Sequence, residues 1–162
     1  MAVFPIRLFG DPVLRQRAAE VPGVDRSVRK LMKDMTDTMR DAPGLGLAAN
    51  QVGILRRVIV WANEDDQGAL ANPLILDKGG QAEDEEGCLS LPGLKYPVVR
   101  SQWVRVQGLN DKGDQVVVEA QDLTARIFQH EIDHVDGILF VDHLSPELQR
   151  EARRRLREEA LK

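Results

Sequence analysis

Apolar residues recur with a helical period in the first quarter of the chain. We predict a helix from Asp25 to about Arg40, with the Asp25 side chain as its N-cap. The apolar positions of this helix are Val28, Leu31, Met32, Met35 and Met39. We interpret the methionine stripe as core packing rather than as a binding surface. A shorter helix, entered through Pro12, is predicted from Asp11 to about Val21.

Strand-like patterns fill the middle of the chain. Runs rich in β-branched and aromatic residues predict strands at residues 57–61, 69–76, 98–109 and 115–121. Between the last two runs, Asn110-Asp111-Lys112-Gly113 predicts a hairpin turn. Residues 63–68 and 78–80 are polar, and we expect short loops there.

Two further helices are predicted in the last third of the chain. Asp122 is expected to cap a helix that ends at Gly137. Ser145 and Pro146 begin the second, in the tail 145–162. Because the strands meet through hairpins, we predict an α+β fold: antiparallel β-sheets packed around a central metal-binding helix, with amino-terminal helices and a carboxy-terminal helix.

Composition agrees with a compact, single-domain protein. With 162 residues, 43% of them hydrophobic, the chain is expected to form a single catalytic domain over residues 1–162. The net charge of −4 gives no overall attraction to nucleic acid or anionic membrane. The sequence shows neither a membrane-spanning apolar run nor a secretory signal. Its single cysteine cannot form an internal disulfide, so we expect a cytoplasmic protein with no membrane or disulfide partner.

The helix expected after Asp122 carries a candidate metal site. His130 and His134 are four residues apart, so their side chains project from one face of the helix. Two imidazoles in this arrangement bind one divalent metal ion, and the adjacent Glu131 is free to move protons. The position of the third histidine in the metzincin pattern is Phe140, so a third ligand must come from elsewhere.

The only cysteine, Cys88, is the best candidate for the third ligand. It lies in Glu86-Gly87-Cys88-Leu89-Ser90. A thiolate with two histidines leaves a fourth position open to water, as in catalytic zinc sites. Alternatives stay open on these residues alone, because the His-Glu-x-x-His pattern also arises by chance and a lone cysteine is often a small buried hydrophobe. His143 falls outside the spacing, and we interpret it as an ordinary residue.

Three segments resemble, in the same order, the signature motifs of the peptide deformylase family of bacterial type. They are Gly44-Leu45-Gly46-Leu47-Ala48-Ala49-Asn50-Gln51, Glu86-Gly87-Cys88-Leu89-Ser90 and Gln129-His130-Glu131-Ile132-Asp133-His134-Val135-Asp136-Gly137. Phe9-Gly10-Asp11-Pro12-Val13-Leu14-Arg15 also resembles the amino-terminal segment of the family. Val135 and Asn50 differ from the usual leucine and the frequent proline of these motifs, and neither position carries chemistry.

The resemblance implies a metal-dependent hydrolase that removes the formyl group from the N-terminal formyl-methionine of nascent polypeptides and releases formate. One divalent ion per chain is then expected on Cys88, His130 and His134. The family is known for ferrous iron, so Fe2+ is the ion expected in the cell, and the donor set also accepts Zn2+, Ni2+ or Co2+.

The resemblance also implies catalytic roles for three residues. Glu131 is expected to accept a proton from the attacking water and to deliver it to the leaving amine. The Gln51 side chain and the backbone N–H of Leu89 are expected to stabilise the oxyanion. Asp133 and Gln129 are candidates for orienting the metal ligands, and Asp133 is alternatively a solvated helix residue.

The sequence also suggests which residues contact the substrate. Gly44 and Gly46 carry no side chain, so an extended peptide can lie against them as an added strand. The family places the methionine side chain in a pocket behind the metal. Ile127, three residues before His130 on the same helix face, is the most credible lining residue. Leu123 either lines this pocket or packs in the core.

The tail 145–162 mixes arginines with glutamates. We interpret it as a solvated helix with ion pairs, docked by Leu148 and Leu156. A contact between this helix and ribosomal RNA is the alternative, which the mixed charge disfavours. Two other function classes stay open for the whole chain. They are a metallopeptidase, which Phe140 and the cysteine motif disfavour, and a non-catalytic metal module, which Glu131 and Gln51 disfavour.

Overall fold

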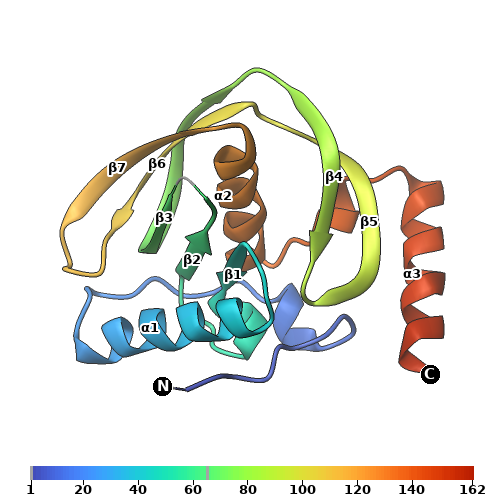
Figure 1. The fold of residues 1–162 in the computed structure, drawn as a ribbon, viewed down its shortest axis with the longest axis horizontal. Helices are drawn as coiled ribbons and strands as arrows, with labels where there is room; N and C mark the ends of the chain where they lie inside the picture. Colours follow the sequence, from blue (N-terminus) through green and yellow to red (C-terminus); the bar gives the residue numbers. More distant parts are fainter. Residues whose placement is uncertain (1, 65) are drawn as a thin grey trace.

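The computed structural model describes residues 2–64 and 66–162 (Figure 1). Its helices are α1 (Arg26–Asp41), α2 (Asp122–Val135) and α3 (Pro146–Ala160), with short 3-10 helices η1 (Pro12–Arg15), η2 (Ala49–Val52) and η3 (Phe140–His143). The strands are β1 (Gly46–Ala48), β2 (Val58–Ala62), β3 (Gln67–Gly79), β4 (Ala82–Cys88), β5 (Leu91–Arg100), β6 (Trp103–Leu109) and β7 (Gln115–Gln121). No helix in the described part of the chain is long and apolar enough to span a membrane.

Two antiparallel sheets enclose α2. One has the strand order β1-β2-β3-β6-β7, and the other is the β4–β5 pair. In Figure 1, α2 runs between the curved larger sheet and the β4–β5 pair, while α1 lies below and α3 packs against the outer side of β5. The predicted α+β fold of antiparallel sheets around a central helix is confirmed.

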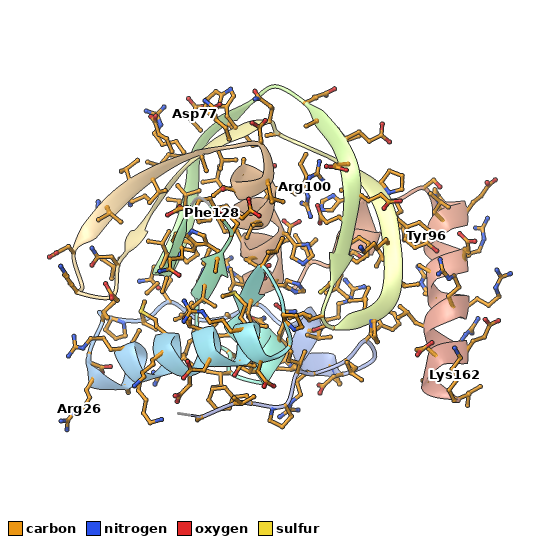
Figure 2. All side chains as sticks on the ribbon, viewed as in Figure 1. Arg26, Asp77, Tyr96, Arg100, Phe128 and Lys162 are labelled. Carbon is orange, nitrogen blue, oxygen red and sulfur yellow. The ribbon has the colours of Figure 1, made fainter. Side chains whose placement is uncertain are left out.

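The core forms where α1 and α2 cover the sheet. Phe128 of α2 is fully buried, and its ring meets that of Trp61 edge to face at 4.6 Å between centroids (Figure 2). Met35 and Met39 of α1 are fully buried among apolar residues of β1 and β2. The interpretation of the methionine stripe as core is therefore confirmed. The predicted N-cap is also confirmed, because the Asp25 side chain accepts a hydrogen bond from the Val28 N–H at 2.9 Å.

The helix expected from Asp11 to Val21 is wrong beyond Arg15. The chain that follows η1 is extended, because its backbone bonds to distant segments. The Ala18 N–H donates to the Val135 carbonyl at 2.8 Å, and the Ala19 N–H donates to the Leu55 carbonyl at 3.0 Å. These tertiary hydrogen bonds replace the helical ones that the local pattern favoured.

The strand expected over residues 98–109 is two strands in different sheets. β5 ends at Arg100 and β6 begins at Trp103. The Gln129 side chain explains the break, because its oxygen accepts from the Ser101 N–H and its nitrogen donates to the Ser101 carbonyl, both at 2.9 Å. Helix α2 thus satisfies the backbone where the chain changes sheet.

Other element boundaries also differ from the prediction. Strands β1 and β4 were not predicted, and the acidic residues of β4 hide its period. Strand β3 includes part of both expected loops, from Gln67 and as far as Gly79. Residue 65 of the first loop lies outside the described residues. The strand at residues 115–121 and its hairpin turn are confirmed.

Two expected helix ends are confirmed and one is wrong. Asp122 is the first residue of α2 and not its N-cap, which is Gln121. Gly137 follows α2 with φ +79°, and a Cβ there would lie 2.7 Å from the Arg15 carbonyl oxygen, so glycine is required. At α3, the Ser145 hydroxyl accepts from the Leu148 N–H at 3.3 Å. Leu156 is buried against β5 and η3, so the expected docking of this helix is confirmed.

The packing of α1 predicts a specific loss of stability. Met35→Ala should lower the free energy of unfolding by about 2–5 kcal/mol, because it empties a fully buried site. Urea denaturation measures this loss. Lys33→Ala, an exposed change on the same helix, is the control and should shift the midpoint little. Equal stability of the two variants would contradict the core role of Met35.

Candidate active site

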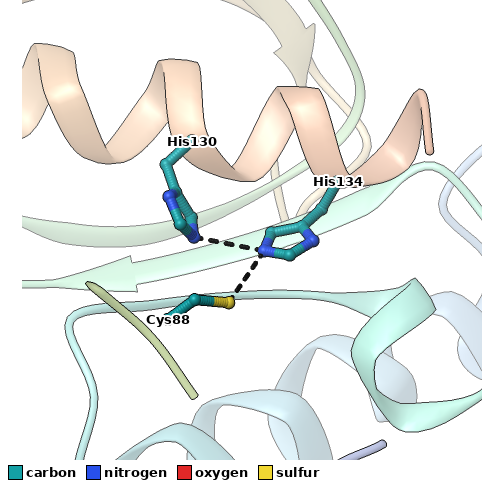
Figure 3. Close-up of side chains that lie close together, drawn as sticks. All are labelled: Cys88, His130 and His134. Atoms are coloured by element: carbon teal, nitrogen blue, oxygen red, sulfur yellow. Dashed lines mark hydrogen bonds between the residues drawn. The ribbon is translucent and has the colours of Figure 1, made fainter. Parts of the chain in front are cut away.

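Three expected ligands converge on one point beside α2 (Figure 3). Cys88 ends β4, and His130 and His134 lie one turn apart on α2. The ligand atoms of all three lie within 4.8 Å of one another. The His134 Nε2 is 3.3 Å from the Cys88 Sγ and 3.1 Å from the His130 Nε2. One sulfur and two ring nitrogens with this convergence fit a single divalent metal ion.

The buried carboxylate of Glu86 holds His130 in a ligand geometry. Its Oε2 lies 2.7 Å from the His130 Nδ1, so Nδ1 carries the proton and the Nε2 lone pair faces the other ligands. Arg100 donates to both carboxylate oxygens at 3.1 and 2.6 Å, and Arg126 donates to Oε1 at 2.9 Å. The sequence prediction missed all three of these residues, although Glu86 stands inside a motif.

The environment of Glu86 keeps it ionised. Burial opposes ionisation, but hydrogen bonds from His130 and Arg100 outweigh it and hold the pKa of the Glu86 carboxyl well below its usual value. The arginines cannot lose their charge, so this carboxylate persists in a site with almost no solvent contact.

Glu86 and its partners His130, Arg100 and Arg126 form a cluster that we call the Glu86 hub. A second set of contacts surrounds this hub. Arg100 donates to the Asp133 Oδ2 at 2.6 Å, and the His143 Nε2 lies 2.8 Å from the same oxygen. Asp133 is therefore linked to the three candidate ligands through Arg100 and Glu86. Gln129 binds Ser101 instead of a ligand. The expectation that Asp133 and Gln129 orient the ligands is not met by direct contact.

His134 differs from His130 in its surroundings. Its Nδ1 is buried and has no hydrogen-bond partner among the described residues. Burial lowers the pKa of His134 well below its usual value. The imidazole is therefore neutral, which is the form that binds metals.

Glu131 is a second buried carboxylate with the opposite environment. Its Oε2 is 4.0 Å from the His130 Nε2, and its Oε1 has no hydrogen-bond partner among the described residues. Burial raises the pKa of Glu131 to about 7. A carboxyl group poised near neutral pH beside three metal-ligand atoms is suited to accept and release protons.

Gly46 makes the position of Glu131 possible. A Cβ at Gly46 would lie 2.5 Å from the Glu131 Oε2, closer than real side chains approach. A Cβ at Gly44 would lie 2.7 Å from the Leu89 Cδ1. The space at both glycines thus admits neighbouring side chains of the site itself, a role that the sequence prediction did not include.

The Gln51 side chain is fixed beside Cys88. Its oxygen accepts from the Ala48 N–H at 2.9 Å, and its nitrogen donates to the Ser90 hydroxyl at 3.1 Å. The same nitrogen lies 3.5 Å from the Cys88 Sγ. An amide donor therefore stands next to the ligand cluster, as the family resemblance implied.

The site opens into a cleft of about 770 Å³. Its walls include Gly44, Gly46, Leu89 and Ile127, which the sequence prediction placed at the substrate. Leu123 also lines the cleft and is 50% exposed, so the core-packing alternative for this residue is wrong. A cleft with apolar residues in its walls and buried polar groups at its base is typical of a ligand-binding site.

These features define the class of protein as a metal-dependent hydrolase: a three-ligand site with an adjacent buried carboxylate at the base of a cleft. The family model described as polypeptide deformylase matches residues 3–150, and the chain belongs to this family.

Individual relatives agree with this assignment. A peptide deformylase from Acidothermus cellulolyticus is 50% identical over 158 residues, which cover 98% of this chain and 88% of the relative. One from Clostridium botulinum is 49% identical, covering 88% of this chain and 97% of the relative. The crystal structure of the Ehrlichia chaffeensis peptide deformylase in complex with actinonin has a TM-score of 0.94 and 37% identity, covering 98% of each chain.

The Glu86 hub predicts a joint loss of stability and metal affinity. Glu86→Gln leaves Arg126 buried without a carboxylate and Arg100 with Asp133 alone, which should lower the free energy of unfolding by about 3–5 kcal/mol. Metal affinity should fall by about 10–100-fold, because a neutral amide replaces the carboxylate that accepts from His130. Equilibrium denaturation and competition with a chelator measure the two effects. Glu85→Gln, an exposed neighbouring change, is the control.

The sign of the pH dependence follows from the lowered pKa of Glu86. Its contribution to stability is fully present above the unfolded pKa of 4.5 and is lost as the pH falls through the lower folded value. The stability difference between the wild type and Glu86→Gln should therefore be constant at neutral pH and shrink in acid. A Glu86→Gln protein with wild-type stability and metal affinity would contradict the hub.

Proposed function

We propose that this chain removes the formyl group from the N-terminal formyl-methionine of nascent polypeptides, with Glu131 as its proton carrier. Membership of the deformylase family supports the reaction. The observation that carries the assignment of roles is the buried carboxylate of Glu131 beside Cys88, His130 and His134, whose Oε1 has no hydrogen-bond partner among the described residues.

One divalent ion per chain is proposed on the Cys88 Sγ and the two Nε2 atoms of His130 and His134. The donor set and the tautomer that Glu86 imposes on His130 support this assignment. Such an ion supplies Lewis acidity, which lowers the pKa of water and polarises a carbonyl oxygen. We propose Fe2+ as the ion in the cell, with Zn2+, Ni2+ or Co2+ as ions that the same donors accept.

Glu131 is proposed to carry one proton through the reaction. Its raised pKa lets the carboxylate accept a proton from the attacking water near neutral pH. The protonated carboxyl then delivers that proton to the amine nitrogen, because an amine leaves poorly without one. Formate and a free amino terminus result.

Gln51 and Leu89 are proposed as the donors to the oxyanion. The Gln51 nitrogen stands beside the Cys88 sulfur, and Leu89 follows Cys88 directly in the chain. An amide and a backbone N–H fixed before the reaction stabilise developing charge without reorganisation.

The substrate is proposed to enter the cleft as an extended peptide. Gly46 is the first residue of β1, an edge strand of the larger sheet, and Gly44 precedes this strand. The proposed peptide adds a further strand at this edge. Ile127 is proposed to contact the methionine side chain. We propose a cytoplasmic location for this reaction, and a ribosome contact through α3 stays a secondary proposal.

Exchange of Glu131 separates binding from chemistry. Glu131→Gln keeps the ligands, so metal content and affinity for a formyl-methionyl peptide should stay within a few fold, as calorimetry measures. Turnover should fall by more than the roughly 10²–10⁴-fold of one proton-transfer step, because the residue acts twice. Formate release measures this loss. If Glu131→Gln kept more than roughly a tenth of wild-type turnover with metal in place, Glu131 could not be the proton carrier.

The identity of the metal predicts a sensitivity to oxygen. If Fe2+ is the ion, formate release by iron-loaded protein should decay in air and persist under nitrogen, because iron and the Cys88 thiolate both oxidise. Protein loaded with Ni2+ or Co2+ should remain active in air. Elemental analysis of protein purified without oxygen identifies the ion. Equal decay of iron-loaded protein with and without oxygen would contradict the proposal.

A further inference from the structure

Ser90 lies directly behind the Gln51 amide. Its side chain is fully buried, and its hydroxyl oxygen accepts the hydrogen bond from the Gln51 nitrogen at 3.1 Å. Its backbone is anchored as well, because the Ser90 carbonyl accepts from the Phe9 N–H at 2.8 Å. The hydroxyl is therefore a fixed acceptor and not a mobile surface group.

The hydrogen-bonding groups of the Gln51 side-chain amide have partners on three residues. The side-chain oxygen is held by the Ala48 N–H, which prevents the amide from exchanging its oxygen and nitrogen. The nitrogen carries two hydrogens, and Ser90 takes one of them. The same nitrogen also donates to the Cys88 Sγ at 3.5 Å, so the second N–H is directed toward the ligand cluster.

We propose that Ser90 is a positioning residue: it holds the Gln51 amide so that one N–H is aimed at the reacting carbonyl oxygen. The inference rests on the proposed role of Gln51 as an oxyanion donor. A donor contributes most when its orientation is set before charge develops, and an unrestrained glutamine side chain loses part of that benefit. Ser90 itself does not touch the substrate.

The effect should appear in turnover and not in binding. Ser90→Ala should lower kcat for a formyl-methionyl peptide by about 10-fold, less than the roughly 10²–10³-fold expected on removing the donor with Gln51→Ala. KM and metal content should stay within about twofold, because neither the ligands nor the cleft walls change. Ser101→Ala is the matched control, because Gln129 binds the backbone of Ser101 and not its hydroxyl.

A double-mutant cycle separates a role through Gln51 from a structural one. If Ser90 acts only through Gln51, Ser90→Ala should cost nothing further in the Gln51→Ala background. Steady-state formate release on the four proteins measures this, and metal content and thermal midpoints are determined on the same samples. An equal kcat loss in both backgrounds, or loss of metal or folding in Ser90→Ala, would overturn the inference.

The outcomes distinguish this inference from the proposed function. Wild-type protein that releases no formate from the peptide would refute the reaction itself. Wild-type kcat in Gln51→Ala would refute the oxyanion role of Gln51. A large loss in Gln51→Ala with none in Ser90→Ala would refute only the positioning role of Ser90.

Discussion

The buried ion cluster at Glu86 joins the fold to the chemistry. Its carboxylate accepts from His130, a proposed metal ligand on α2, and from two arginines, one on β5 and one on α2. Arg126 also donates to the carbonyls of Ala82 and Val98, which lie on the two strands of the smaller sheet. The interactions that seat the β4–β5 pair on α2 therefore also orient His130. A buried charge of this kind is tolerated only when its partners are complete, so a change in one partner reaches both the sheet and the metal site.

The two buried glutamates, Glu86 and Glu131, suit different roles because their surroundings differ. Glu86 accepts from His130, Arg100 and Arg126, and the first two hold its pKa low against the effect of burial. Glu131 lies close by, has one oxygen without a partner among the described residues, and has its pKa raised to about 7 by burial. The first suits a permanent anion that fixes a histidine, and the second suits a group that gains and loses a proton. Gly46 supports this division, because any side chain there would displace Glu131.

The features that depend on nearby residues in the chain were predicted correctly from the sequence. Helical spacing located α1 and the pair His130–His134, and motifs brought Cys88 and Gln51 to the same site. The failures arose where distant backbone groups pair. Hydrogen bonds to Leu55 and Val135 extend the chain after Arg15, and Gln129 breaks the run expected at residues 98–109. Arg100 joins the Glu86 hub only through tertiary contact, and no spacing pattern marks it in the sequence. Ser90 stood within a motif, but its contact with Gln51 required the fold.

The central proposal for this site is one ion held by Cys88, His130 and His134, with Glu86 behind His130 and no further protein ligand. Crystals of protein loaded with Co2+, measured on both sides of the cobalt absorption edge, test this most directly. We expect one anomalous peak per chain, at about 2.3 Å from the Cys88 Sγ and about 2.0–2.1 Å from each Nε2. A peak elsewhere, a fourth protein ligand, or binding of His130 through Nδ1 would contradict the account.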